Sequence, residues 1–116
     1  MNPLDLDRVH DVFGDDVEDA YEVLKTARDA ALRCVDRIDE AVRDNDVNSL
    51  LNTFHDLKGF AGNVGAGELA ATAEHLEARL QRGEGIEAVA PSKDELRACI
   101  NRLTAAMEAL RASPQP

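Results

Sequence analysis

Apolar residues recur three and four positions apart through most of this chain. In the longest such run, residues 17–43, the apolar positions are Val17, Ala20, Tyr21, Leu24, Ala27, Ala31, Cys34, Val35, Ile38, Ala41 and Val42. This spacing is typical of a helix that buries one face. We predict that the helix is capped by Asp15 and runs to about Arg43, where Asp44 and Asn45 break it.

Four further segments show the same spacing and are predicted as helices. They run from Asn2-Pro3 to Gly14, from Asp46 or Asn48 to about Val64-Gly65, from Ala66 or Gly67 to about Gly83, and from a capping box of Ser92 and Glu95 to about residue 112. Residues 83–91 are predicted as a loop. The four long helices with short connections predict an all-α fold, an antiparallel up-down four-helix bundle with a short additional N-terminal helix over one end. We expect one domain over residues 1–112 and a flexible tail at 113–116.

Composition and charge narrow the possible partners. The net charge is −10, which argues against binding to nucleic acid or to an anionic membrane surface. No run approaches the roughly 20 apolar residues of a membrane span, and no signal peptide is apparent. Cys34 and Cys99 occupy apolar helix positions and are predicted to be buried reduced thiols, consistent with a cytoplasmic location. We expect a monomer, because no second apolar stripe remains, and the initial Met favours a free-standing chain.

The third predicted helix has two contrasting faces. Its core face is formed by Val47, Leu50, Phe54, Leu57, Ala61 and Val64. The other face carries His55 and Lys58 together with Gly59 and Gly62. Each glycine costs roughly 0.8–1 kcal/mol relative to alanine inside a helix. Bare backbone beside the imidazole would let another surface approach it, although Gly59 could instead allow close packing on a neighbouring helix.

The chemistry of this face points to phosphoryl transfer. Lys58 lies one turn after His55, so a nucleophilic nitrogen stands next to a cation that could hold a transferred phosphoryl group. The sequence has no Gly-rich phosphate loop, kinase catalytic set, Glu-x-x-His pair or zinc-ligand spacing. We therefore expect a stoichiometric carrier and not an enzyme, with no nucleotide, cofactor or metal site of its own. His10 and His75 are predicted to be surface or packed residues without a functional role.

A family resemblance supports this interpretation. The residues that carry it are His55-Asp56-Leu57-Lys58-Gly59, Asn63-Val64-Gly65-Ala66, Leu69 and Leu76-Glu77. Together they resemble the histidine phosphotransfer (HPt) domains of bacterial multistep phosphorelays. The chain departs from the family pattern at three positions, namely Phe54, Asp56 and Phe60. Asp56 places an additional negative charge near a future phosphate.

The resemblance implies a phosphoacceptor and its partners. His55 would accept a phosphoryl group on Nε2 from a receiver-domain phospho-aspartate and pass it to another response regulator, with Mg²⁺ held by the receiver. Lys58 would stabilise the phosphate charge. Helical geometry adds Leu51 and Asn52, one turn earlier, to Gly59 and Gly62 as docking residues. Asn63 and Gly65 are expected to shape the helix exit.

Two other functions remain open from the sequence. The chain could be an unphosphorylated helical module that binds and regulates a receiver or a kinase. It could also accept phosphate directly from the ATP-binding domain of a kinase in trans. The sequence does not identify the cognate receiver or the direction of phosphate flow.

Overall fold

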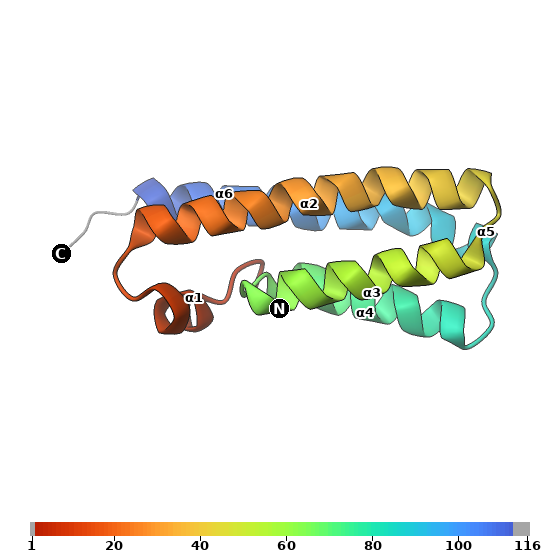
Figure 1. Cartoon of the computed structure of the whole chain (residues 1–116), viewed down its shortest axis with the longest axis horizontal. Helices are drawn as coiled ribbons and strands as arrows, with labels where there is room; N and C mark the ends of the chain where they lie inside the picture. The colour runs from red at the N-terminus through yellow and green to blue at the C-terminus, as the bar shows by residue number, and fades with distance from the viewer. Residues whose placement is uncertain (1, 113–116) are drawn as a thin grey trace.

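The computed structural model describes residues 2–112, and every regular element in that range is a helix (Figure 1). The elements are α1 (Leu6–Phe13), α2 (Val17–Arg43), α3 (Val47–Asn63), α4 (Gly67–Gln81), α5 (Ile86–Val89), the 3₁₀ helix η1 (Ala90–Ser92) and α6 (Lys93–Ala112). The long helices α2, α3, α4 and α6 run alternately up and down, which confirms the predicted bundle (Figure 1). The predicted tail at 113–116 lies outside the described residues, and the domain limits stay a prediction.

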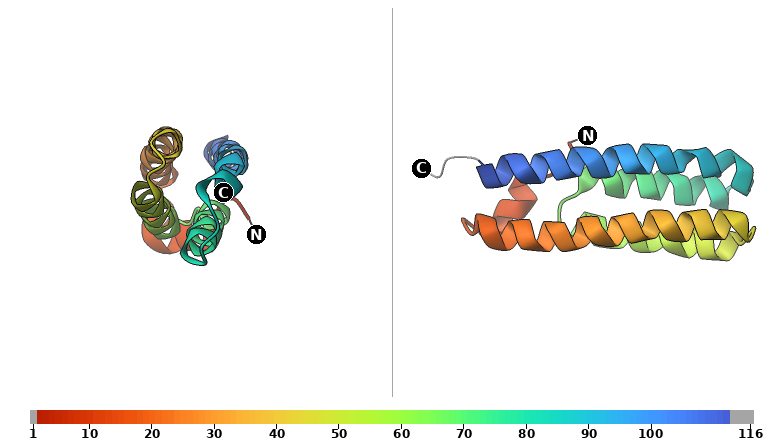
Figure 2. Two further views of the ribbon diagram at one scale, coloured as in Figure 1. Left: turned by 90° about the vertical axis from the view of Figure 1, so that its right-hand side faces the viewer. Right: turned by 90° about the horizontal axis from the view of Figure 1, so that it is seen from above.

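Unequal helix lengths explain the position of α1. α2 has 27 residues and α3 has 17. At 1.5 Å per residue these helices are about 40 Å and about 26 Å long. The first turns of α2 therefore extend beyond α3, and α1 lies in the space below them (Figure 1). The described chain measures 51 × 21 × 17 Å. The end-on view in Figure 2 shows the four long helices grouped around a common axis, and their buried side chains form one core cluster.

On the four long helices, the core follows the predicted apolar faces with one clear exception. Leu24, Phe54 and Leu57 are among the fully buried side chains. Val47, which we predicted to be inward, is instead 43% exposed, because it opens the first turn of α3 next to exposed Asp46. None of the described helices combines the length and apolar character that a membrane crossing requires.

Both cysteines are buried in this core, as predicted. Cys34 is 3% exposed and Cys99 is 2% exposed, and each is a free thiol. Burial raises the pKa of both thiols above the usual value, because the interior disfavours the charged thiolate.

Aspartate caps set the starts of the first three helices. α1 begins after Asp5, whose carboxylate accepts a hydrogen bond from the Arg8 amide, so the predicted start at Asn2-Pro3 is wrong. α2 is capped by Asp16, which accepts from the Asp19 amide, and not by the predicted Asp15. α3 begins after Asp46, one of the two predicted caps.

The segment between α4 and α6 differs from the predicted loop. It folds into α5 and η1, in which Ile86 and Val89, three residues apart, are buried. Ser92 belongs to η1, which leads directly into α6, so the predicted capping box is wrong. The Ser92 hydroxyl instead accepts a hydrogen bond from Arg79 Nη1 at 3.5 Å.

The exit of α3 is held by the N-terminal segment. The Asp5 amide donates to the Gly65 carbonyl at 2.7 Å, and Arg8 Nε donates to the Asn63 carbonyl at 3.4 Å. Gly65 has a φ of +83°, and a Cβ there would lie 3.2 Å from Arg8 Cγ. Only glycine suits this backbone and this close approach. The segment therefore fixes where α3 ends and where α4 begins.

An ion-pair cluster joins α2 to α6 and makes stability depend on pH. Lys93 Nζ donates to Asp39 Oδ1 at 2.8 Å, and Arg97 Nη2 lies 3.7 Å from Asp39 Oδ2. The Lys93 hydrogen bond holds the pKa of Asp39 below its ordinary value. A lowered pKa stabilises the fold above the unfolded-state value of about 3.9, and this contribution is lost as pH falls through the folded-state pKa.

We predict that Asp39→Asn lowers the free energy of unfolding by about 0.5–1 kcal/mol at neutral pH, because the pairs are partly exposed. The loss should shrink towards zero near about pH 2, where wild-type Asp39 is also protonated. Urea unfolding at both pH values measures it. Asp36→Asn, at an exposed position of the same helix, is the matched control and should change little at either pH. A difference that stays constant with pH would contradict the prediction.

Candidate functional site

His55 lies near the middle of α3 with its ring in solvent. Its side chain is 69% exposed, whereas Phe54 and Leu57 on the core face are 1% and 0% exposed. Because successive helix residues are about 100° apart, burying those two side chains turns the imidazole away from the core. The structure thus places His55 on the outer face, where the apolar pattern predicts it.

A nearly buried carboxylate from α4 holds the imidazole. The Glu77 side chain is 11% exposed, and its Oε2 lies 3.2 Å from His55 Nδ1. An ionised carboxylate only accepts hydrogen bonds, so the hydrogen of a neutral imidazole belongs on Nδ1. The lone pair is then on Nε2, the other nitrogen of the exposed ring. The contact selects both the tautomer and the orientation of the ring.

Lys58 binds the other oxygen of the same carboxylate. Its Nζ donates to Glu77 Oε1 at 3.1 Å, and its side chain is 33% exposed. The carboxylate is thus shared between His55 and Lys58, one turn apart on α3. With a neutral imidazole, the ammonium and the carboxylate balance each other, so the free site has no net charge.

The predicted docking residues occupy the same side of α3. Asn52, Gly59 and Gly62 are exposed, and Leu51 is half-buried against the core. A Cβ built at Gly59 meets nothing within 4 Å, and one at Gly62 meets only Ala70 Cβ at 4.0 Å. The alternative that Gly59 allows close packing on a neighbouring helix is therefore wrong. Neither glycine is required by the packing of this chain.

Glu77 was not predicted as a site residue, although it belongs to the motif. It lies four residues after Ala73 and three before Leu80, on the buried stripe of α4. A carboxylate on such a stripe requires polar partners, because burying it alone is costly. The position of Glu77 on this stripe could be recognised in the sequence. The partners of Glu77 could not be predicted, because the sequence does not fix the register of α3 against α4.

The other histidines are surface residues, as predicted. His10 is 70% exposed and its Nδ1 lies 4.0 Å from Asp15 Oδ1, and His75 is exposed on α4. Across residues 2–112, no group of three or more His, Cys, Asp or Glu side chains is arranged to hold a metal ion.

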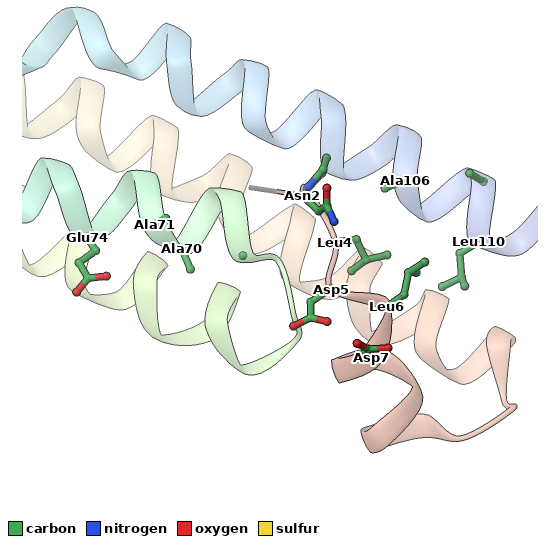
Figure 3. A pocket seen from close by; sticks show the side chains of 13 residues that line it. Asn2, Leu4, Asp5, Leu6, Asp7, Ala70, Ala71, Glu74, Ala106 and Leu110 are labelled. Carbon is green, nitrogen blue, oxygen red and sulfur yellow. The ribbon is translucent and has the colours of Figure 1, made fainter.

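A hollow lies where residues 2–7 cross the start of α4 and the end of α6, and His55 is not among the residues that line it (Figure 3). Figure 3 shows Leu4 and Leu6 beside Ala106 and Leu110, with Asp5, Asp7 and Glu74 also lining the hollow. α4 and α6 pack less closely than the other neighbouring long helices, and the N-terminal segment partly fills the resulting space.

Comparison with known proteins identifies the family. The sequence-family model of the Hpt domain matches residues 13–113, which is most of the chain. This chain belongs to the Hpt domain family. Hpt domains are phosphoryl carriers of phosphorelays and interact with receiver domains.

A solved structure shares the fold of this Hpt domain. It is the crystal structure of the HPT domain from a sensor hybrid histidine kinase of Shewanella, which is 23% identical in sequence. The match covers 98% of this chain and 97% of that chain, with a TM-score of 0.73. A comparison with curated proteins gives no match.

Proposed function

We propose that this Hpt domain accepts a phosphoryl group on Nε2 of His55 from the phospho-aspartate of a receiver domain and passes it to another response regulator. The observation that carries the proposal is the exposed ring whose Nδ1 lies 3.2 Å from the Glu77 carboxylate. Such a ring offers one nucleophilic nitrogen in a fixed direction. In-line positioning is the main requirement of phosphoryl transfer.

The transfer step uses the existing hydrogen bond and releases no proton. The Nε2 lone pair attacks phosphorus, the bond between phosphorus and the aspartyl oxygen breaks, and the electron pair stays on the receiver's carboxylate. The hydrogen on Nδ1 remains, so the phosphorylated ring becomes cationic beside Glu77. The carboxylate stabilises this positive charge. Mg²⁺ on the receiver would neutralise charge on the phosphoryl oxygens. The second transfer is the same step in reverse.

Lys58 would act on the product side of this step. An ammonium has three N–H donors, and Glu77 accepts one of them at 3.1 Å. The remaining donors can bind a phosphoryl oxygen without breaking the contact with Glu77. Lys58 would thereby help to retain the phosphoryl group between the two encounters.

Glu77→Ala should slow transfer strongly, because the ring and the ammonium both lose the group that orients them. We expect transfer on the order of tenfold to a hundredfold slower, as is usual when a reacting group is misplaced. Glu77→Gln is the matched variant, since its carbonyl can still accept a hydrogen bond, and it should retain more of the rate. Single-turnover transfer from a phosphorylated receiver measures both. Equal rates in the wild type and Glu77→Ala would show that the carboxylate does not position His55.

The direct test mixes this domain with purified receiver domains that have been phosphorylated in the presence of Mg²⁺. We expect the domain to gain a phosphate that is labile in acid and stable in base, as phosphohistidine is. Adding a second, unphosphorylated receiver should then remove the label. Binding without any label would support the unphosphorylated interaction module. Labelling by a kinase ATP-binding domain with no receiver present would support direct transfer from a kinase.

A further inference from the structure

A second, shallow hollow lies on the flank of α3 that faces α2. It is lined by Ala30, Arg33, Cys34, Arg37, Asp56 and Phe60. Arg37 Nη2 donates to Asp56 Oδ2 at 3.2 Å, so the residue that follows His55 is tied to α2. Phe60 is only half-buried and forms an apolar side of the hollow.

The charges of this hollow are unusual for the molecule. The chain has a net charge of −10, yet the hollow contains two arginines and one aspartate. Arg37 is paired with Asp56, whereas Arg33 has no ion-pair partner among residues 2–112. An exposed guanidinium that no carboxylate of its own chain satisfies can pair with a carboxylate of another molecule.

The hollow is continuous with the face that carries His55. On a helix of about 100° per residue, Gly59 lies about 40° from His55 and about 60° from Asp56, between the two. Gly59 is exposed and a Cβ there would meet nothing within 4 Å, so no side chain projects from α3 between the His55 ring and the Arg37–Asp56 pair. A protein that settles on Gly59 to reach His55 therefore also comes close to Arg37.

We propose that the receiver-docking surface extends across Gly59 onto α2, where Arg33 and Arg37 select a receiver that presents carboxylates beside an apolar side chain. The apolar group would contact Phe60, and the carboxylates would pair with the two guanidiniums. Asp56 holds Arg37 in position in the free protein. This inference rests on the proposed function, because it names the partner surface of the same site. It assigns receiver selection to two arginines of α2, and one of them, Arg37, contacts Asp56, which lies 19 residues later on α3.

Arg33→Glu tests the proposal, with Lys25→Glu as the matched control. Both residues are exposed on α2 and both changes alter the net charge equally, but Lys25 lies outside the hollow. With a receiver that labels the wild type, Arg33→Glu should lower the rate of transfer at subsaturating receiver on the order of tenfold, through slower association. The rate at saturating receiver should change little. Added salt should reduce the difference in transfer rate between the wild type and Arg33→Glu, because ions screen exposed charges.

Labelling by phosphoramidate, a small donor that needs no docking surface, separates the possible failures. Arg33→Glu should be labelled by phosphoramidate at the wild-type rate and should melt at the wild-type temperature. Arg33→Ala should also slow transfer from a receiver, but by less than Arg33→Glu does. If Arg33→Glu and Lys25→Glu transfer alike, the docking proposal is overturned while the carrier function stands. If no receiver labels the wild type, the proposed function itself fails.

Discussion

His55→Gln should take up no detectable phosphate from a phosphorylated receiver, a loss of at least about a hundredfold, because the nucleophile itself is removed. Glutamine keeps a similar length and can donate its amide hydrogen to Glu77. The His55 side chain is 69% exposed, so the substitution removes little packing. We expect the free energy of unfolding to change by less than about 1 kcal/mol. Acid-labile label and thermal melting, measured on the same samples, check both halves of the prediction.

His75→Gln is the matched control for this experiment. His75 is also exposed on a long helix, but it lies on α4 outside the Glu77 contacts. It should take up label as the wild type does. Label that persists in His55→Gln, or that disappears in His75→Gln, would sink the assignment of His55. Partner binding and signalling that are unchanged in His55→Ala would indicate an interaction module that does not use the phosphate.

The bundle could be predicted because its helices are long enough to repeat their pattern. α2 shows its apolar spacing over seven turns, so a single discordant residue does not obscure it. α5 has four residues, which is about one turn, and no period can be recognised in so short a segment. The predicted cap of α2 was wrong for a different reason. Asp15 and Asp16 are adjacent and chemically identical, and only the backbone geometry decides which of them caps α2.

The part of the candidate site that lies on a single helix could be predicted from the sequence. The position of His55 opposite Phe54 and Leu57 follows from the helical repeat, and so does its spacing from Lys58. Contacts between helices do not follow from it. Glu77 lies 22 residues after His55, and Arg37 lies 19 before Asp56. Both contacts depend on how far one helix is shifted and rotated against its neighbour, which core packing decides.

Substitutions at Gly59 should separate stability from transfer. Gly59 is an exposed position inside α3, and a Cβ there meets nothing within 4 Å. Alanine and leucine are both better helix formers than glycine, so Gly59→Ala and Gly59→Leu should each raise the free energy of unfolding by about 0.5–1 kcal/mol. For a domain of this size that corresponds to a rise in Tm of about 2–8 °C. Thermal melting measures this gain.

Transfer should respond in the opposite direction. A leucine side chain at position 59 would project beside the imidazole, on the surface that an incoming receiver must contact. We expect Gly59→Leu to slow transfer from a receiver about tenfold to a hundredfold, whereas Gly59→Ala should slow it much less, because a methyl group adds little bulk. Phosphoramidate, which is small enough to pass the side chain, should label both variants at similar rates.

Ala105→Leu provides the control for added bulk. Ala105 is exposed on α6, outside the site, so leucine there should leave transfer unchanged. If Gly59→Leu transferred as fast as the wild type, the bare backbone beside His55 would have no role in docking. A slow but more stable Gly59→Leu would show that this glycine lowers the stability of the free protein and keeps His55 within reach of a receiver.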